Sequence, residues 1–150
     1  MPILRGGETH SVDSKGRVKI PSRMLKSLTN EDVEMFIFTR GLDKCINAYP
    51  LNYWKEVEKK IENTNEFNSK DRYFLRYFMM WTDEGLLDGQ QRIILPKKFM
   101  ELAGIKNEVL ILGVKDHLEF WDPLRFEKYL QSQEADDYEY EKISEEVMTK

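Results

Sequence analysis

Residues 13–21 read DSKGRVKIP, and the same order of residue types returns at residues 88–96 as DGQQRIILP. Each stretch places Arg four residues after Asp and ends an apolar run at Pro. Asp at the first position of a tight turn can accept backbone N–H bonds, and Gly16 can take the positive φ that ends such a turn. The stretch therefore predicts a turn followed by a short strand, and the chain contains it twice.

The similarity extends well beyond the two turns. Three pairs of segments match, namely 13–28 with 88–103, 35–38 with 109–112, and 48–54 with 120–126. A solenoid needs at least three repeats to bury its core, and this chain has two. The repeat therefore predicts an α+β protein of two tandem βαββα units, related by a pseudo-twofold axis and closed around a shared core.

The turn residues and the apolar patterns place the elements. The expected strands are residues 8–12 and 17–20, which form a hairpin, then 33–39, 45–49, 108–114 and 118–121. Helices are expected after Pro21, near Pro50, over 69–81 with Ser69 as the N-cap, and near Pro123. The predicted organisation is a first unit at 1–64, a linking helix at 65–82, a second unit at 83–133, and a tail at 134–150 that is frayed helix or disordered.

The charges are distributed unevenly along the chain. The net charge is −4, yet residues 1–30 carry six cations against two acids, and residues 134–150 carry seven acids against two lysines. A basic N-terminal region and an acidic tail therefore share one chain. No apolar run approaches the roughly 18–20 residues of a membrane span, and residues 1–10 lack the long apolar region of a secretory signal. With Cys45 as the single cysteine, a reducing cytoplasm is the expected location.

The basic residues of the first repeat are the candidates for function. Arg17 and Lys19 alternate with Val18 and Ile20, so both basic side chains leave the strand on the face opposite the core. A two-stranded ribbon with such a face fits the DNA major groove, where Arg pairs with guanine and Lys neutralises phosphate. A structural alternative stays open, in which Asp13 bonds to Arg17 or to the turn backbone.

Other conspicuous residues favour structural roles. Neither His10 nor His117 has a plausible nucleophile or metal partner nearby in sequence, and His117 falls in a predicted turn. The aromatic block YFLRYFMMW at 73–81 has helical spacing and favours the core or a subunit interface over a platform for single-stranded nucleic acid. No phosphate loop, metal cluster or catalytic constellation occurs, so neither an enzyme nor a cofactor is expected.

Five motifs stand out along the chain: GETHSVDSKGRVKIPSRM (7–24), YPLNYW (49–54), RYFLRYFMMWTDEGLLD (72–88), QRIILP (91–96) and EFWD (119–122). Together they resemble the MraZ family of bacterial transcriptional regulators. The resemblance covers about residues 4–133. It implies two AbrB-type swapped-hairpin halves that form one β-barrel with peripheral helices. It also implies a ring-shaped homo-oligomer, with an octamer expected, that is associated with the nucleoid. This ring would bind direct DNA repeats upstream of its own division and cell-wall gene cluster.

The resemblance also assigns roles to residues. DNA-binding residues would be Lys15, Arg17 and Lys19, with His10 and Arg92 beside them. Asp13, Gly16 and Asp88 would shape the turns, and Arg23, Lys97 and Lys98 would add phosphate contacts. The family has Gly before the Arg of the second turn, where this chain has Gln91. We therefore expect a second turn of different shape, whose Asp88 and Arg92 chiefly complete the barrel.

An interaction protein is the alternative. AbrB-type barrels also serve as antitoxins, whose acidic tails wrap a toxin, and the tail at 134–150 is compatible with that role. Antitoxin chains usually carry one hairpin unit, whereas this chain carries two.

Overall fold

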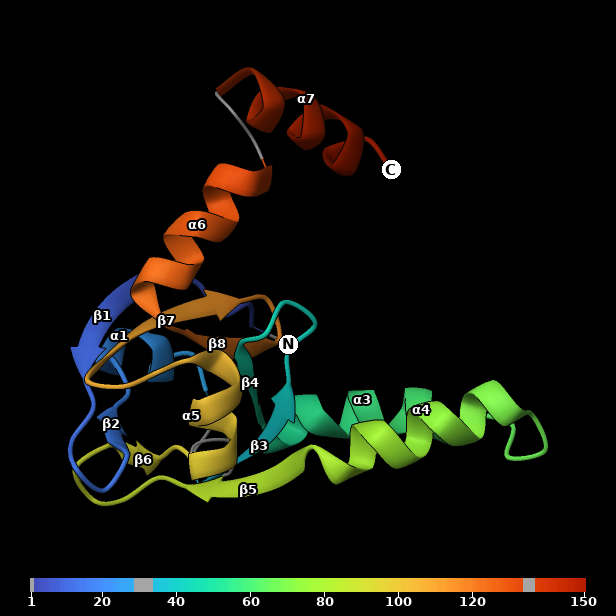
Figure 1. Ribbon diagram of the computed structural model, residues 1–150, viewed down its shortest axis with the longest axis horizontal. Coiled ribbons are helices and arrows are strands. Elements are labelled where there is room, and N and C mark those ends of the chain that lie inside the picture. The colour runs from blue at the N-terminus through green and yellow to red at the C-terminus, as the bar shows by residue number, and fades with distance from the viewer. Residues whose placement is uncertain (1, 29–33, 134–136) are drawn as a thin grey trace.

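The structure, a computed structural model, describes residues 2–28, 34–133 and 137–150. The first half holds β1 (Gly7–Ser11), β2 (Arg17–Lys19), α1 (Ser22–Leu25), β3 (Met35–Arg40), β4 (Ile46–Pro50), α3 (Leu51–Glu62) and α4 (Ser69–Met80). The second half holds β5 (Thr82–Leu86), β6 (Arg92–Ile94), α5 (Lys97–Ala103), β7 (Glu108–Val114), β8 (His117–Trp121), α6 (Pro123–Gln133) and α7 (Asp137–Met148). The fold is α+β, with helices arranged around a large antiparallel sheet (Figure 1).

The strand order of the large sheet shows how the two halves combine. The order is β1-β7-β8-β4-β3-β5, and every neighbouring pair is antiparallel. The hairpins β3–β4 and β7–β8 lie at the centre, while β1 pairs with β7 and β5 pairs with β3. Each edge strand therefore belongs to the half opposite its partner. If each strand is replaced by its counterpart in the other half (β1 by β5, β3 by β7 and β4 by β8), the order becomes the same list read from its other end. A pseudo-twofold repeat requires this symmetry.

The predicted hairpin of residues 8–12 with 17–20 is wrong. β1 pairs with β7, and β2 pairs with β6 in a separate two-stranded ribbon, with Val18 opposite Ile93. The turn at 13–16 thus leads the chain from the sheet into the ribbon. The physical reason is that a repeat offers each strand two equivalent partners. Pairing with the other half places the apolar faces of both ribbon strands over one core.

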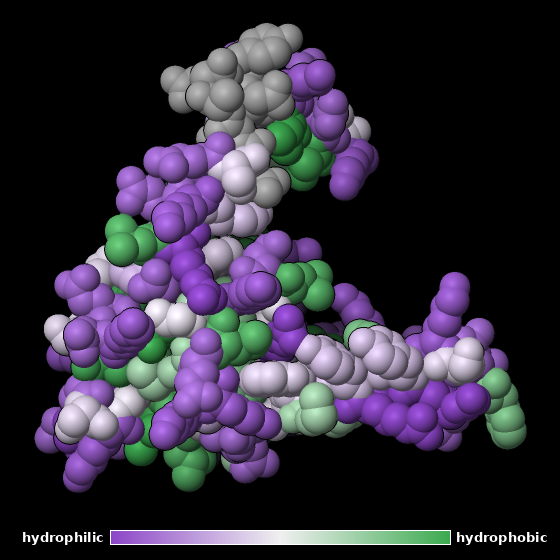
Figure 2. All heavy atoms as spheres, in the orientation of Figure 1, coloured by the Kyte–Doolittle hydropathy of each residue, from purple (hydrophilic) through white to green (hydrophobic). Residues whose placement is uncertain are grey.

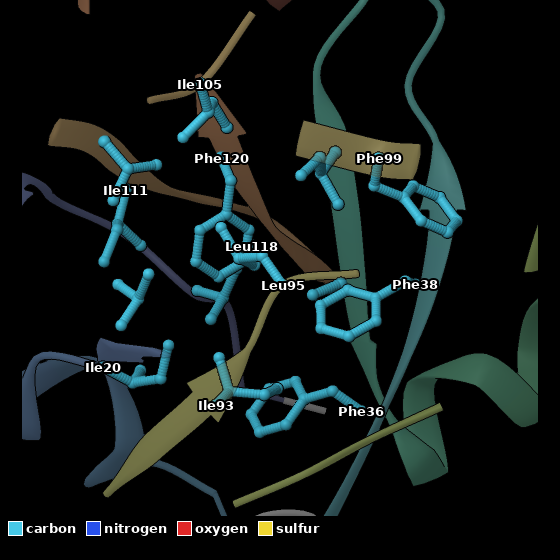
Figure 3. Close-up of a cluster of buried hydrophobic side chains, with 14 of the residues drawn as sticks. Ile20, Phe36, Phe38, Ile93, Leu95, Phe99, Ile105, Ile111, Leu118 and Phe120 are labelled. Atoms are coloured by element: carbon cyan, nitrogen blue, oxygen red, sulfur yellow. The ribbon is translucent and has the colours of Figure 1, made fainter. Parts of the chain in front are cut away.

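The core lies between the ribbon and the sheet. Figure 3 shows Ile93 and Leu95 of the ribbon side beside aromatic side chains of the sheet, with Ile20 in the same cluster. The Phe38 and Phe99 rings are 6.0 Å apart, which joins β3 to α5. Burial of each such side chain contributes roughly 1.5–3 kcal/mol. The fully buried residues come from both halves: Val18, Ile20, Phe36, Phe38, Ile46, Ala48, Phe99, Val109, Ile111 and Phe120.

The helices follow the proline and glycine signals. Pro50 precedes α3 and Pro123 starts α6, as predicted, and α5 ends at Gly104 with φ of 70°. The N-cap of α4 is Asn68 rather than Ser69, because the Asn68 side chain accepts from the N–H groups of Lys70 and Asp71. The tail forms the helix α7 over its described part. No helix of the described residues is long and apolar enough to cross a membrane.

The aromatic block at 73–81 meets the core at its end, where the partly buried Trp81 packs on Phe99 with ring centroids 5.3 Å apart. No side chain of α4 is buried, although Trp54 of α3 is, and its ring stacks on Phe78 at 6.1 Å. α3 and α4 run side by side and project from the sheet (Figure 1). The core interpretation is therefore wrong for residues 73–80 of α4 and correct for Trp81. The spacing of residues 73–80 is that of an amphipathic helix with one face on α3 and the other in solvent.

Candidate nucleic-acid interface

The first turn is organised around one carboxylate. Asp13 Oδ1 accepts hydrogen bonds from the backbone N–H groups of Lys15 and Arg17, each at 2.9 Å. Asp13 Oδ2 accepts from Arg17 Nε at 2.6 Å, and Gly16 N–H donates to the Asp13 carbonyl at 3.0 Å. The N–H of Arg17, followed by its guanidinium, lowers the pKa of Asp13. The carboxylate therefore stays ionised and fixes the Arg17 side chain in direction.

The second turn has the same bonds. Asp88 Oδ1 accepts from the N–H groups of Gln90 and Arg92, at 2.8 and 2.9 Å, and Oδ2 accepts from Arg92 Nε at 2.9 Å. Gln91 has φ of 61°, close to the 81° of Gly16. The expectation that Gln91 gives this turn a different shape is therefore wrong. Here a non-glycine residue adopts the left-handed conformation, and its side-chain Oε1 accepts from Ser22 Oγ at 2.9 Å.

The two turns lie at opposite ends of the ribbon formed by β2 and β6. Arg17 is opposite Ile94, and Lys19 is opposite Arg92. Because Val18 and Ile93 face the core, these four side chains share the outward side, which we call the ribbon face. The Gly16 carbonyl accepts from Leu95 N–H at 2.9 Å. Each turn is thus bonded to the end of the opposite strand, which makes the ribbon face a continuous surface.

The ribbon face is basic and partly pre-oriented. The ribbon and its turns bring four cations (Lys15, Arg17, Lys19 and Arg92) together with two carboxylates. The Arg17 and Arg92 side chains are 32% and 30% exposed. Among the described residues each guanidinium is bonded only through Nε. The terminal nitrogens of both arginines are therefore available for a ligand outside the protein.

The other predicted contacts lie elsewhere. His10 Nε2 is 3.1 Å from Glu8 Oε1, and Arg23 Nε donates to Glu8 Oε2 at 2.5 Å, so both surround one carboxylate on β1. Arg23, followed by His10, lowers the pKa of Glu8. Lys98 Nζ donates to the Met80 carbonyl at 3.1 Å, at the end of α4. Lys97 is exposed on α5.

Sequence reasoning missed Ile94 as part of the ribbon face. It is 56% exposed and takes the place that Lys19 has in the first repeat. The alignment of 13–28 with 88–103 contained that correspondence.

Sequence reasoning also placed His117 in a turn, whereas it begins β8.

His117 sits in a small acidic cluster. Its Nδ1 is 2.8 Å from Asp116 Oδ1 and its Nε2 is 3.1 Å from Glu119 Oε2. Burial lowers the pKa of His117, but hydrogen bonds to Glu119 and Asp116 outweigh it and raise the pKa. The cluster borders a groove of about 540 Å³ between α3–α4 and the sheet. Within the described residues, no group of three or more potential ligands could hold a metal ion.

Comparison with known proteins gives the same repeat. Residues 3–77 and 78–147 each match the family described as "MraZ protein, putative antitoxin-like". A protein of Natranaerobius thermophilus named "Transcriptional regulator MraZ" is 39% identical over 146 residues, covering 97% of each chain. A protein of the same name from Acetivibrio thermocellus is 42% identical over 128 residues, covering 85% of this chain and 86% of the relative.

The solution structure of PHS018 from Pyrococcus horikoshii is less similar. It aligns with a TM-score of 0.32 and 20% identity, over 77% of this chain and 97% of that chain, and adds nothing to the description of the fold. The two matched segments together span nearly the whole chain and divide it into the two halves seen in the sheet. The chain belongs to the MraZ family.

Proposed function

We propose that the protein is a sequence-specific, DNA-binding transcriptional regulator that acts in the cytoplasm on the nucleoid. The relatives named transcriptional regulators support the class of function. The single observation that supports the site is the basic ribbon face, with one anchored arginine near each end. A two-stranded ribbon has the right width for the DNA major groove.

The anchored arginines suit base recognition. Asp13 holds Arg17 through Nε and leaves both terminal nitrogens for guanine O6 and N7. A side chain that is already ordered loses less conformational entropy on binding. One good arginine–guanine pair discriminates by about 1–3 kcal/mol. Lys15 and Lys19 are less restrained and would neutralise phosphates.

The second turn is part of the same reading surface in this proposal. Arg92 has the same bonds to Asp88 that Arg17 has to Asp13. It lies opposite Lys19 on the ribbon face. We therefore extend the site beyond the first repeat, although Ile94 makes the second half of the face less basic.

A ring of subunits would multiply weak contacts. The exchange of β1 and β5 between halves supports a double swapped-hairpin barrel as the protomer. Subunits of a ring homo-oligomer, an octamer in this proposal, would each place a ribbon on one direct repeat, spaced about 10 bp apart. High effective concentration then raises the affinity of the whole assembly. The target would be the repeats upstream of its own division and cell-wall gene cluster.

A salt titration of DNA binding tests the proposal. Parent, Arg17→Ala and Arg92→Ala are compared on a duplex from the region upstream of the protein's own gene and on a scrambled duplex. Lys128→Ala, which removes an exposed cation from α6, is the control. We expect each arginine variant to lose discrimination between the duplexes, with the oligomer mass unchanged. A phosphate contact would instead lower affinity for both duplexes and flatten the salt dependence.

One result would refute the site. If Arg17→Ala discriminates between the two duplexes as well as the parent does, the ribbon face does not read the bases.

A further inference from the structure

The outward face of α4 combines aromatic and basic side chains. Tyr73, Tyr77 and Met80 are 69%, 36% and 58% exposed, and their spacing of four and three residues forms one stripe. Arg72 and Arg76 run along the edge of this stripe and are exposed. In Figure 2 the α3–α4 region shows weakly polar side chains beside strongly hydrophilic ones. We call these five residues the α4 face.

Contacts within the protein hold the α4 face in shape. The rings of Tyr73 and Tyr77 stack with centroids 6.0 Å apart, and the Arg40 guanidinium lies 5.3 Å from the Tyr77 ring. On the opposite side of the helix, Phe78 stacks on Trp54 and anchors α4 to α3. A hollow of about 360 Å³ opens between Arg72, Tyr73, Arg76, Tyr77 and Met80. The face is therefore preformed and has room for a side chain.

The helix α7 carries the complementary surface. Tyr140, Ile143 and Val147 are 67%, 46% and 51% exposed, and their spacing of three and four residues also forms one stripe. Glu141 and Glu146 lie on opposite edges of this stripe, as the 100° step of a helix requires. In both stripes the first and last residues are seven positions apart, which is about 10 Å of helix. In Figure 2 hydrophobic side chains of α7 are visible beside hydrophilic ones.

We propose that α7 of one copy of this chain docks on the α4 face of a second copy. Ile143 and Val147 would cover the aromatic stripe. Because acids lie on both edges of α7, either direction of the helix brings a carboxylate to the arginines of the α4 face. Among the described residues Arg76 has no ion pair, and Arg72 donates to the Glu66 carbonyl at 3.0 Å. The occupant is thus an acidic amphipathic helix, which the chain itself supplies.

The geometry favours a second copy over the same chain. α6 leads away from α3–α4, and only residues 134–136 separate α6 from α7 (Figure 1). The inference rests on the self-association in the proposed function and adds the surfaces that would make it. The acidic tail would then be bound to α4 rather than free to compete with DNA for the ribbon face.

Disulfide trapping between copies tests the contact. Tyr73→Cys and Ile143→Cys variants of the full chain are mixed under mild oxidation. We expect a covalent dimer from the mixture. In the control, Leu42→Cys, at a fully exposed position, is mixed with Ile143→Cys in place of Tyr73→Cys. We expect no covalent dimer from this mixture. Cys45 is 1% exposed and does not interfere. A further variant carries both Tyr73→Cys and Ile143→Cys in one chain. A disulfide within that chain, with none between copies, would overturn the proposal.

Charge reversal tests the same contact without cysteines. Arg72→Glu/Arg76→Glu should weaken self-association at least tenfold, as followed by sedimentation over a concentration series. Mixing it with Glu141→Arg/Glu146→Arg should restore association. Lys128→Glu is the control for a single reversal and should leave association unchanged. A failure of the mixture to recover contradicts the pairing of these charges.

The outcomes separate this inference from the proposed function. If removal of residues 137–150 leaves both the assembly mass and its concentration dependence unchanged, the α7 contact is wrong while the ring stands. The contact is also refuted if a toxin-like partner binds α7 and the removal of α7 leaves self-association unchanged. DNA discrimination is measured separately, so an Arg17→Ala variant that still discriminates between the duplexes refutes the reading site alone.

Discussion

Gly16 and Gln91 occupy equivalent positions in the two turns, and both have a positive φ, at 81° and 61°. Each donates its N–H to the carbonyl of the turn aspartate at 3.0 Å. The conformation is free for Gly, but costs an L-residue about 1–2 kcal/mol. The hydrogen bond that Gln91 accepts from Ser22 offsets part of that cost. One backbone shape is therefore achieved by two different means.

Gly16→Ala should destabilise the protein by about 1–2 kcal/mol. A Cβ at Gly16 would lie 3.0 Å from the Leu95 carbonyl, and the positive φ adds strain. Gly89→Ala is the matched control, because a Cβ there meets nothing within 4 Å and φ is not positive. Urea unfolding at one fixed protein concentration measures both. Equal midpoints for the two variants would contradict the strain argument.

Asp13→Asn should raise affinity for scrambled DNA and lower discrimination. The substitution removes a negative charge beside the ribbon face, which favours phosphate contacts in any sequence. It also leaves Arg17 without the carboxylate that orients it. We expect the ratio of specific to non-specific affinity to fall about tenfold, near the lower end of what one arginine–guanine pair supplies.

Asp88→Asn compares the second turn under the same assay. An equal loss of discrimination would show that both turns read DNA, and no loss would limit reading to the first. If Asp13→Asn keeps the parent's ratio, Arg17 does not need its anchor.

The acidic cluster around His117 should make stability depend on pH. The raised pKa of His117 means that its charged form stabilises the fold below 6.5, and this contribution is lost as pH rises through the raised value. Despite burial, bonds from His117 and Trp121 lower the pKa of Glu119, so its contribution is present above 4.5 and is lost at lower pH. The cluster is therefore most stabilising between these values.

His117→Gln tests this window. The substitution should cost more thermal stability near about pH 5.5 than near about pH 9. A cost that is the same at both values would show that His117 does not become charged in the fold.

Cys45 should react slowly with thiol reagents in the native protein. Its side chain is 1% exposed, and burial raises its pKa to about 12. Because the thiolate is the reactive form, an aromatic disulfide reagent should modify Cys45 only when the protein opens. The rate of modification in urea should follow unfolding. Rapid modification in buffer would mean that the connection between β3 and β4, which holds Cys45, opens readily.

The positions of most strands were predictable because alternation is a local property. Val18 and Ile20 alternate with Arg17 and Lys19, and that pattern alone separates a core face from a solvent face. The partner of each strand is not a local property. In a repeat, β2 has two equivalent candidates, and only the closed core selects β6. The exposure of α4 was equally out of reach, since helical spacing does not say which apolar faces remain uncovered.

For the candidate site, the sequence predicted which residues belong to it but not how they are arranged. The Asp–Arg spacing led to the turns, and the alignment identified both arginines. The conformation of Gln91 could not be read from its residue type, because a side chain that usually avoids positive φ occupies it here. The gathering of Lys19 and Arg92 on one face depends on the pairing of β2 with β6, which sequence reasoning had wrong.

The exchange of edge strands has a consequence for the newly made chain. β1 is complete at Ser11, yet its partner β7 begins only at Glu108. At about 5–20 residues per second, a ribosome needs on the order of 5–20 seconds to make the residues between them. During that time the nascent first half carries a strand with no neighbour on either side. Its protection must come from outside the chain until β7 has been made.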